Sequence, residues 1–339
     1  MNQPFDAVLL IAFGGPRGRG DIRPFLANVL RGRRVPAERL EEVVHHYERF
    51  GGVSPITELT MRQAEGLEAV LATSGSALPV YVGMRNWDPY LRDTLARMSR
   101  DGVRRAIGVI ASAHRSYSGC LQYRENVTEA RLALHDHGLA DVEITYVNDW
   151  HLSRGFIDAN ADHIQAALET LPAAVRWEAE LVFTAHSIPV EMAERYPYQR
   201  QLEESCKAIA AEVSRRVAGD QDPPWRLVYQ SRSGRPGDPW LEPDVCDHLR
   251  VAAAHGARAV VLCPVGFICD HIEVLYDLDV EAAAVARELG LPLARASAVN
   301  AHPRFIDALR EAVEERVRLY SSGRAMALRG FQGGFRGFQ

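Results

Sequence analysis

The chain has 339 residues, of which 47% are hydrophobic and 24% are charged, and its formal net charge is −5. This length allows two domains of ordinary size, and the negative charge argues against a general nucleic-acid binder. No window approaches the roughly 18 apolar residues of a membrane span, and the five cysteines are scattered without a CxxC pair, so neither a disulfide framework nor a local metal motif is indicated. We therefore expect a cytoplasmic globular protein.

Short apolar runs alternate with longer helical patterns along the chain. Strands are predicted at 6–13, 79–84, 105–112, 142–147, 180–185, 226–231, 258–265 and 292–296, and helices at 20–31, 37–50, 57–73, 88–100, 121–137, 154–170, 191–218, 243–255, 271–289 and 302–320. This alternation is typical of parallel sheets with right-handed crossovers. Eight strands could close a barrel, but the uneven connections favour two α/β halves. We predict two doubly wound, Rossmann-like domains, each with a four-stranded parallel sheet, facing each other across a cleft.

The division between the two halves is expected near residue 150. An N-terminal domain would cover 1–150 and a C-terminal domain 151–301, with the helix at 302–320 joining the first domain. The run at 7–13 lacks a basic leader and meets Gly14-Gly15-Pro16, so we interpret it as a first strand rather than a signal peptide. The glycine-rich, repetitive segment 321–339 is expected to be a mobile tail.

The connection between the first two strands contains a basic run and a glycine turn. Arg31 and Arg33 belong to the sequence RGRR at 31–34, and GGVSPI follows at 51–56. A basic run is usually a solvated face, but arginine forks could also capture substrate carboxylates. The glycine pairs are not a dinucleotide fingerprint, because no GxGxxG follows a strand.

The predicted helix at 271–289 carries acids among apolar residues. Glu273, Asp277 and Glu281 recur at i, i+4 and i+8 and therefore share one face. A helix that is apolar on most sides is buried, so these acids are expected to point into an internal cavity that a cation visits. The alternative is a solvated stripe on a surface helix.

A histidine lies at the end of another predicted strand. The apolar run at 180–185 leads into His186 and Ser187, and ligands of open parallel sheets bind beyond the carboxyl ends of the strands. The acidic helix begins at the same edge, after the strand at 258–265. A lone histidine at a strand end is more often a hydrogen-bonded structural residue. Together, the imidazole and the carboxylates make a metal-handling site plausible.

Several motifs along the chain resemble those of the ferrochelatases, which insert ferrous iron into a porphyrin. The resemblance covers about residues 5–318. The motifs are AFGGP at 12–16, GGVSPI at 51–56, TAHSIP at 184–189, YQSR at 229–232, DPWL at 238–241 and GFICDHIE at 266–273. The glycine turns alone are weak signals, whereas the histidine motif combined with the acidic helix is specific.

The resemblance implies a porphyrin held between two domains, with His186 and Glu273 as the catalytic pair and metal-site residues. Asp277 and Glu281 match an acidic ladder that passes iron or protons inward. Insertion needs few ligands that hold Fe²⁺ loosely, and a neutral imidazole can accept pyrrole protons near pH 7. Iron is thus a substrate, and no tightly bound cofactor is expected. The neighbours expected to support the pair are His271 and Ser187.

Within the family, the polar and basic segment at 31–38 resembles the coproporphyrin III ferrochelatases, whose substrate carries four propionates. The porphyrin-contact positions then fall on Phe13, Leu30, Arg31, Arg33, His46, Tyr47, Ser54 and Tyr123. Phe13 stands where that group commonly has a tyrosine that ligates the product iron. Leu30 and His46 replace arginines that meet propionates.

Three other functions remain open from the sequence. They are a protoporphyrin IX ferrochelatase, a cobalt or nickel tetrapyrrole chelatase, for which His271 could be a second histidine, and a non-catalytic porphyrin- or haem-binding homologue. No C-terminal cysteine cluster is present, so no [2Fe–2S] centre is expected. The expected partners are coproporphyrin III, ferrous iron and the next enzyme of haem synthesis. We expect a monomer without nucleic-acid binding or a membrane span.

Overall fold

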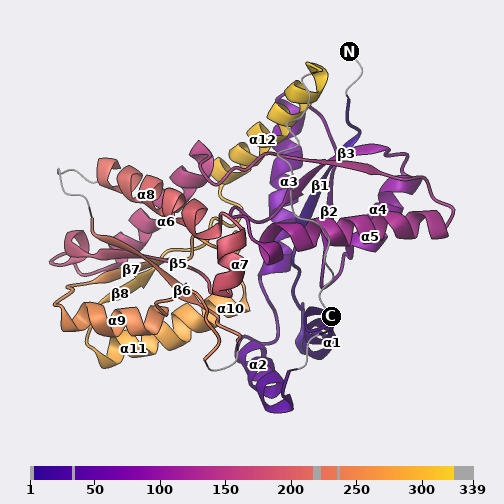
Figure 1. Ribbon diagram of the computed structural model, residues 1–339. Coiled ribbons are helices and arrows are strands. Elements are labelled where there is room, and N and C mark those ends of the chain that lie inside the picture. The colour runs from indigo at the N-terminus through magenta and orange to yellow at the C-terminus, as the bar shows by residue number, and fades with distance from the viewer. Residues whose placement is uncertain (1–3, 33–34, 217–222, 235–236, 324–339) are drawn as a thin grey trace.

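The computed structural model describes residues 4–32, 35–216, 223–234 and 237–323. It contains two four-stranded parallel sheets with equivalent strand orders, β2-β1-β3-β4 and β6-β5-β7-β8 (Figure 1). The strands are β1 (Ala7–Ala12), β2 (Val80–Met84), β3 (Arg105–Ile110), β4 (Glu143–Tyr146), β5 (Glu180–His186), β6 (Trp225–Gln230), β7 (Val260–Cys263) and β8 (Leu293–Arg295). The predicted strands are all present, and the predicted fold class of two doubly wound α/β halves is confirmed.

Helices cover both faces of each sheet. On the first sheet, α4 (Leu91–Arg100) and α5 (Gln122–Asp136) lie opposite α3 (Ile56–Thr73) and α12 (Pro303–Ser321). On the second, α9 (Val245–Ala254) and α11 (Ala283–Glu288) lie opposite α6 (Arg154–Thr170) and α8 (Tyr198–Arg216). The inner faces of the two sheets share one continuous apolar core. Because strands such as β1 are buried on both faces, they form uninterrupted apolar runs in the sequence.

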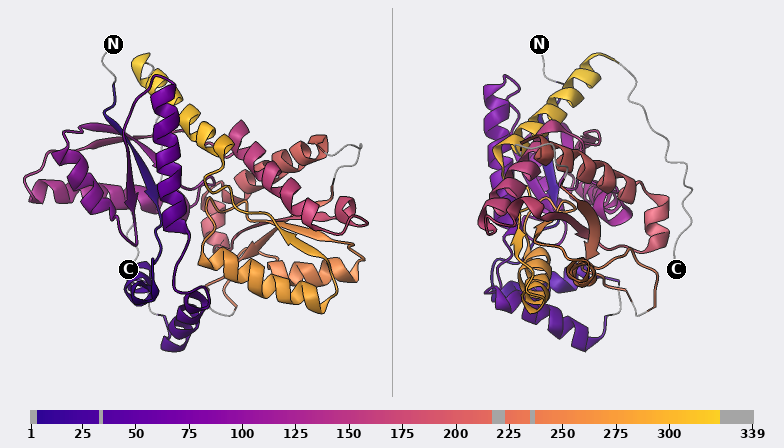
Figure 2. Two further views of the ribbon diagram at one scale, coloured as in Figure 1. Left: turned by 180° about the vertical axis from the view of Figure 1, so that it is seen from behind. Right: turned by 90° about the vertical axis from the view of Figure 1, so that its left-hand side faces the viewer.

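The helix α12 connects the two halves. It packs against α3 of the first half and α6 of the second, as both views of Figure 2 show. Gly155 permits the close approach to α6, because a Cβ at this position would collide with the carbonyl group of Arg304. The domain boundary near residue 150 stays a prediction. No helix in the described part of the chain is long and apolar enough to cross a membrane.

Two predicted helices are wrong in detail. The helix expected at 191–218 is two helices, α7 (Val190–Arg195) and α8, because Pro197 lacks an amide hydrogen and restricts the residue before it. The helix expected at 271–289 consists of α10 (Ile272–Val274), the π-helix η4 (Leu275–Ala282) and α11. The remaining elements are η1 (Arg19–Asp21), α1 (Ile22–Val29), α2 (Ala37–Arg49), η2 (Tyr117–Leu121) and η3 (Arg176–Glu178). Arg33 and the tail from residue 324 lie outside the described residues.

Candidate active site

The carboxyl ends of β5 and β7 mark the point where the second sheet reverses its strand order, and open parallel sheets bind ligands outside such a point. His186 is the last residue of β5, and Glu273 lies in α10, beyond the loop after β7. Gly266 holds that loop against β5. Its amide donates to the Thr184 carbonyl at 3.0 Å, and a Cβ there would lie 2.6 Å from Cβ of Ala185. A side chain at position 266 would push the loop after β7 away from the carboxyl end of β5.

His186 and Glu273 face each other, with Nε2 of His186 3.9 Å from Oε1 of Glu273. The Nδ1 atom of His186 bonds to the carbonyl oxygen of Ser187. Because a carbonyl only accepts, Nδ1 carries the hydrogen, and the neutral ring has its lone pair on Nε2. The two side chains are 33% and 48% exposed. His186, as a base or metal ligand, and the carboxylate of Glu273 are therefore both accessible to a substrate.

The carboxylates Glu273, Asp277 and Glu281, called the acidic row below, lie in succession along α10 and η4. Glu273 and Glu281 are exposed and Asp277 is half-buried. The row therefore opens to solvent, and the expectation of an enclosed cavity is wrong for its two ends. Asp277 Oδ2 accepts hydrogen bonds from Ser231 and, at 3.1 Å, from Gln230 Nε2. Ser231 has φ of 61°, which is uncommon for a residue other than glycine.

The row differs from ordinary surface acids in its pKa values. Burial, followed by the charge of Glu273, raises the pKa of Asp277 to about 7. Burial and then Asp244 raise the pKa of Glu281. Among the described residues, no arginine or lysine forms an ion pair with Asp277 or Glu281. A π-helix is a frequent feature of functional sites. In this one, Asp279 is paired with Arg295, whereas Asp277 and Glu281 have no such partner among the described ion pairs.

The two predicted neighbours of the pair lie close to it. Burial lowers the pKa of His271. The charge of Glu273 raises this pKa and the charge of His186 lowers it further, so His271 lies within the electrostatic reach of both members of the pair. Ser187 is buried, and its hydroxyl donates to the Leu241 carbonyl at 2.8 Å. The carbonyl that orients His186 is thereby held in place.

The helix α2 brings two more predicted residues to the acidic row from the first half. The rings of His46 and Tyr276 are stacked, with centroids 3.5 Å apart and planes at 12°. Burial and then the charge of Glu273 raise the pKa of Tyr47. Tyr276, which the sequence reasoning did not single out, is therefore part of the site.

A second group lies at the equivalent edge of the first sheet. The guanidinium carbon of Arg85 lies 4.7 Å from the ring centroid of Tyr123 and 5.9 Å from that of Phe13. Phe13 follows β1, and Tyr123 lies in the first turn of α5 and is buried. Ser54 is also buried, with its amide donating to the Pro16 carbonyl at 2.8 Å. Arg85 was missed, although it directly follows the predicted strand at 79–84, where the strand-end rule could have found it.

The basic segment is not brought to the His186–Glu273 pair by any described contact. Leu30 caps α1, and Arg31 is exposed and donates to Asn28 Oδ1 at 2.9 Å. Arg33 lies outside the described residues. A role for this segment in propionate binding therefore stays a prediction.

The described residues contain no group of three or more histidines, cysteines or acids placed to hold a metal ion. A closed structural metal site uses four protein ligands, whereas the His186–Glu273 pair offers two. The five cysteines are free, and the expectation about an iron–sulfur centre stays a prediction. The arrangement suits a metal that binds and leaves.

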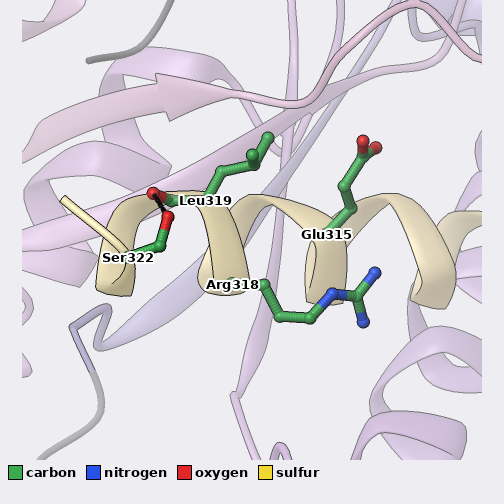
Figure 3. Close-up of a pocket in the computed structure, with 4 residues that line it drawn as sticks. All are labelled: Glu315, Arg318, Leu319 and Ser322. Carbon is green, nitrogen blue, oxygen red and sulfur yellow. Dashed lines mark hydrogen bonds between the residues drawn. The ribbon is translucent and has the colours of Figure 1, made fainter. Parts of the chain in front are cut away.

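A pocket of about 430 Å³ lies elsewhere, along α12 (Figure 3). It is lined by Glu315, Arg318, Leu319 and Ser322, and the Ser322 hydroxyl donates to the Leu319 carbonyl at 2.9 Å. Figure 1 places this end of α12 at the top of the molecule, at the opposite end from α2 and away from α10, which lies in the middle. The pocket contains none of the predicted site residues.

Known structures share this architecture. SirB from Bacillus subtilis, solved with Fe³⁺, aligns with a TM-score of 0.57 at 11% identity over 94% of this chain and 97% of that chain. The sirohydrochlorin chelatase SirB from Bacillus subtilis subspecies spizizenii, solved with cobalt, aligns with a TM-score of 0.53 at 10% identity over the same shares. At such identities the likeness shows the fold alone.

Sequence relatives are much closer. The chain is 48% identical to the coproporphyrin III ferrochelatase of Streptomyces coelicolor over 92% of this chain and 86% of the relative. It is 48% identical to the coproporphyrin III ferrochelatase of Mycolicibacterium vanbaalenii over 91% of this chain and 89% of the relative. It is 46% identical to the ferrochelatase of Rhodopirellula baltica over 93% of this chain and 87% of the relative. The ferrochelatase family model matches residues 5–317. The chain therefore belongs to the ferrochelatase family.

Proposed function

We propose that the chain inserts Fe²⁺ into coproporphyrin III and so produces Fe-coproporphyrin for haem synthesis. The observation that carries the proposal is the His186–Glu273 pair at the switch point of the second sheet, with the acidic row beside it. The activity of metal insertion follows from the family. The choice of porphyrin is supported by the relatives named as coproporphyrin III ferrochelatases.

The proposed reaction exchanges two pyrrole protons for one Fe²⁺. The Nε2 lone pair of His186 accepts a proton or holds the incoming metal, and Glu273 balances the positive charge that forms. Asp277 is suited to relay protons, because a pKa of about 7 lets it gain and lose one at neutral pH. Since only two ligands face each other here, iron can leave for the macrocycle.

An anaerobic insertion assay with coproporphyrin III and protoporphyrin IX tests the substrate. We expect a higher kcat/KM for coproporphyrin III, because a charge-assisted arginine–carboxylate contact contributes roughly 1.5–3 kcal/mol and this substrate has two more propionates. Equal kcat/KM values for the two porphyrins would contradict the proposed substrate. A higher kcat/KM for protoporphyrin IX would identify the chain as a protoporphyrin IX ferrochelatase instead. The same assay with Co²⁺ and Ni²⁺ identifies a different metal specificity, and binding without insertion identifies a non-catalytic homologue.

The product complex offers an independent test at Phe13. A phenyl ring packs on a macrocycle but has no donor oxygen, so the wild-type product should lack a phenolate-to-iron charge-transfer band. Phe13→Tyr should introduce that band and slow product release. A tyrosinate-type spectrum in the wild-type complex would contradict this assignment.

We further propose a cytoplasmic monomer that passes its product to the next enzyme of haem synthesis. Five unpaired cysteines support a reducing compartment. Size-exclusion chromatography with light scattering checks the oligomeric state, and a stable dimer would contradict it.

A further inference from the structure

The contact between His46 and Tyr276 joins the two halves beside the acidic row. His46 belongs to α2, and Tyr276 lies in η4 between Glu273 and Asp277. The rings lie face to face, 3.5 Å apart and within 12° of parallel. The helix α2 packs beside α10, which Figure 1 shows as the approach of the first half to the second below the sheets. An anchored Tyr276 holds the backbone that carries both neighbouring carboxylates.

The surroundings of His46 suit a cation better than a propionate. Burial lowers the pKa of His46, which favours the neutral ring, and the charges of Glu42 and Glu273 act on it from α2 and α10. Arg39 also lies near, but its guanidinium is paired with Glu42 at 2.6 Å. Because Glu42 and Arg39 are paired with each other, the charge that an incoming propionate would still meet beside His46 is that of Glu273, which is negative.

The helix α2 is held to the first half through α1 and contacts the second half at α10. Val44 is the one buried residue of α2, and it joins a small satellite cluster with Ile22, Phe25 and Leu26. Leu40, Val43 and Tyr47 of α2 pack against the same cluster. The stack on Tyr276 adds an aromatic pair to the contact between α2 and the second half.

We propose that His46 is a positioning residue: it stacks on Tyr276 and thereby sets the affinity of the acidic row for the incoming metal. It does not contact a porphyrin propionate. This inference rests on the proposed function of metal insertion. The stack aligns Glu273 and Asp277 along η4. Loss of the stack lets this segment shift, which weakens metal capture and leaves the porphyrin face unchanged.

Steady-state kinetics of His46→Ala distinguish a residue that positions the acidic row from a residue that binds a porphyrin propionate. The KM for Fe²⁺ should rise roughly two- to tenfold, as expected for loss of one aromatic pair, while the KM for coproporphyrin III stays within about twofold of wild type. His46→Phe keeps a flat ring and should restore the wild-type KM for Fe²⁺. His45→Ala is the matched control on the same helix, because the His45 side chain is 74% exposed and bonds only to Glu48 among the described residues.

A double-mutant cycle tests whether the two rings act together. Tyr276→Ala should reproduce His46→Ala, the double variant should be no worse than either single change, and Tyr276→Phe should behave as wild type. A rise in the porphyrin KM alone would overturn the proposal in favour of a propionate contact. Failure of His46→Phe to restore the KM would overturn it in favour of a metal-ligating nitrogen, and wild-type kinetics for His46→Ala would overturn it outright.

Calorimetric titration of Zn²⁺ into the porphyrin-free protein keeps this test separate from the proposed function. His46→Ala should weaken Zn²⁺ binding by the same factor as the KM for Fe²⁺, and His46→Phe should not. If the wild-type protein inserted no metal into any porphyrin, the proposed function would fail, while the Zn²⁺ titration would still decide the role of the stack. Unchanged Zn²⁺ affinity in His46→Ala would overturn the inference.

Discussion

Two groups of carboxylates in this molecule have the same chemistry and opposite surroundings. The acidic row has no arginine partners among the described ion pairs, and burial raises the pKa of Asp277 to about 7. The second group, called the paired cluster below, is Asp158, Asp162 and Glu212 between α6 and α8. Hydrogen bonds from Arg215 and then Arg216 lower the pKa of Glu212 to about 2, although its side chain is only 4% exposed. The arginines of the paired cluster are Arg154, Arg215, Arg216 and Arg304.

The difference shows how to distinguish a structural acid from a functional one. A carboxylate that has its own arginine is satisfied in the folded chain and stabilises it. A half-buried carboxylate that lacks a cation destabilises the fold until a cation arrives, and such residues are retained at functional sites. The acidic row and the paired cluster should therefore respond to mutation in opposite ways.

The largest effect should come from the pair at the head of the acidic row. His186→Ala removes the Nε2 lone pair and should lower kcat by about 10²–10⁴-fold, the usual contribution of a general base. Glu273→Gln should also cripple turnover. Porphyrin binding, followed by fluorescence quenching, and the midpoint of urea unfolding should change little, because both side chains are partly exposed. Near-normal turnover of His186→Ala at neutral pH would contradict the assignment.

The paired cluster should show the reverse. Glu212→Gln removes one of the three carboxylates that pair with Arg216, which is 14% exposed, and should lower the free energy of unfolding by about 3 kcal/mol at unchanged kcat. Because the folded pKa of Glu212 lies below its ordinary value of 4.5, this stabilisation is present above pH 4.5 and is lost as the pH falls toward 2. Urea unfolding at pH 7 and pH 3 measures it. Glu194→Gln is the control, because Glu194 is exposed. If Glu212→Gln lowered the free energy of unfolding equally at both pH values, that result would contradict the argument.

Asp277→Asn should separate the two groups by the sign of the pH effect. The folded pKa of about 7 exceeds the ordinary 3.8, so between these values the folded state keeps a proton that the unfolded state has lost. Stability therefore falls as the pH rises through this window. The asparagine oxygen can still accept from Gln230 and Ser231. We expect Asp277→Asn to raise the Tm more at pH 8 than at pH 5 and to raise the KM for Fe²⁺. A gain in Tm independent of pH would show that Asp277 is ionised at both values.

The smallest effect should come from the exposed end of the row. Glu281→Gln should raise the KM for Fe²⁺ roughly two- to fivefold, in the range of an exposed charge interaction, with kcat near wild type. The same anaerobic assay measures it. If Glu281→Gln were more harmful than Glu273→Gln, the inner and outer ends of the row would have to be exchanged.

Much of the fold could be predicted because burial on both faces makes the central strands, such as β1 and β7, apolar runs. Once the strands were located, the strand-end rule pointed to His186 and to the start of the acidic row. The exposure of Glu273 could not be predicted, because it depends on how the two halves meet. The stack of His46 on Tyr276 joins residues far apart in the chain, and no local pattern relates them. The π-helical turn also left no signal, since a widened turn keeps acids four residues apart on nearly one face.

The helix α12 has a consequence for the order in which the protein forms during synthesis. Leu67 and Leu71 of α3 share their core with Phe305, Leu309 and Val313 of α12, yet about 230 residues are made between the two helices. While the ribosome adds the second half, the inner face of the first half lacks this cover. We therefore expect the nascent first half to depend on chaperones until residues 303–321 emerge, and ribosome-stalled chains that end near residue 300 should be more sensitive to protease in α3 than chains in which α12 has emerged.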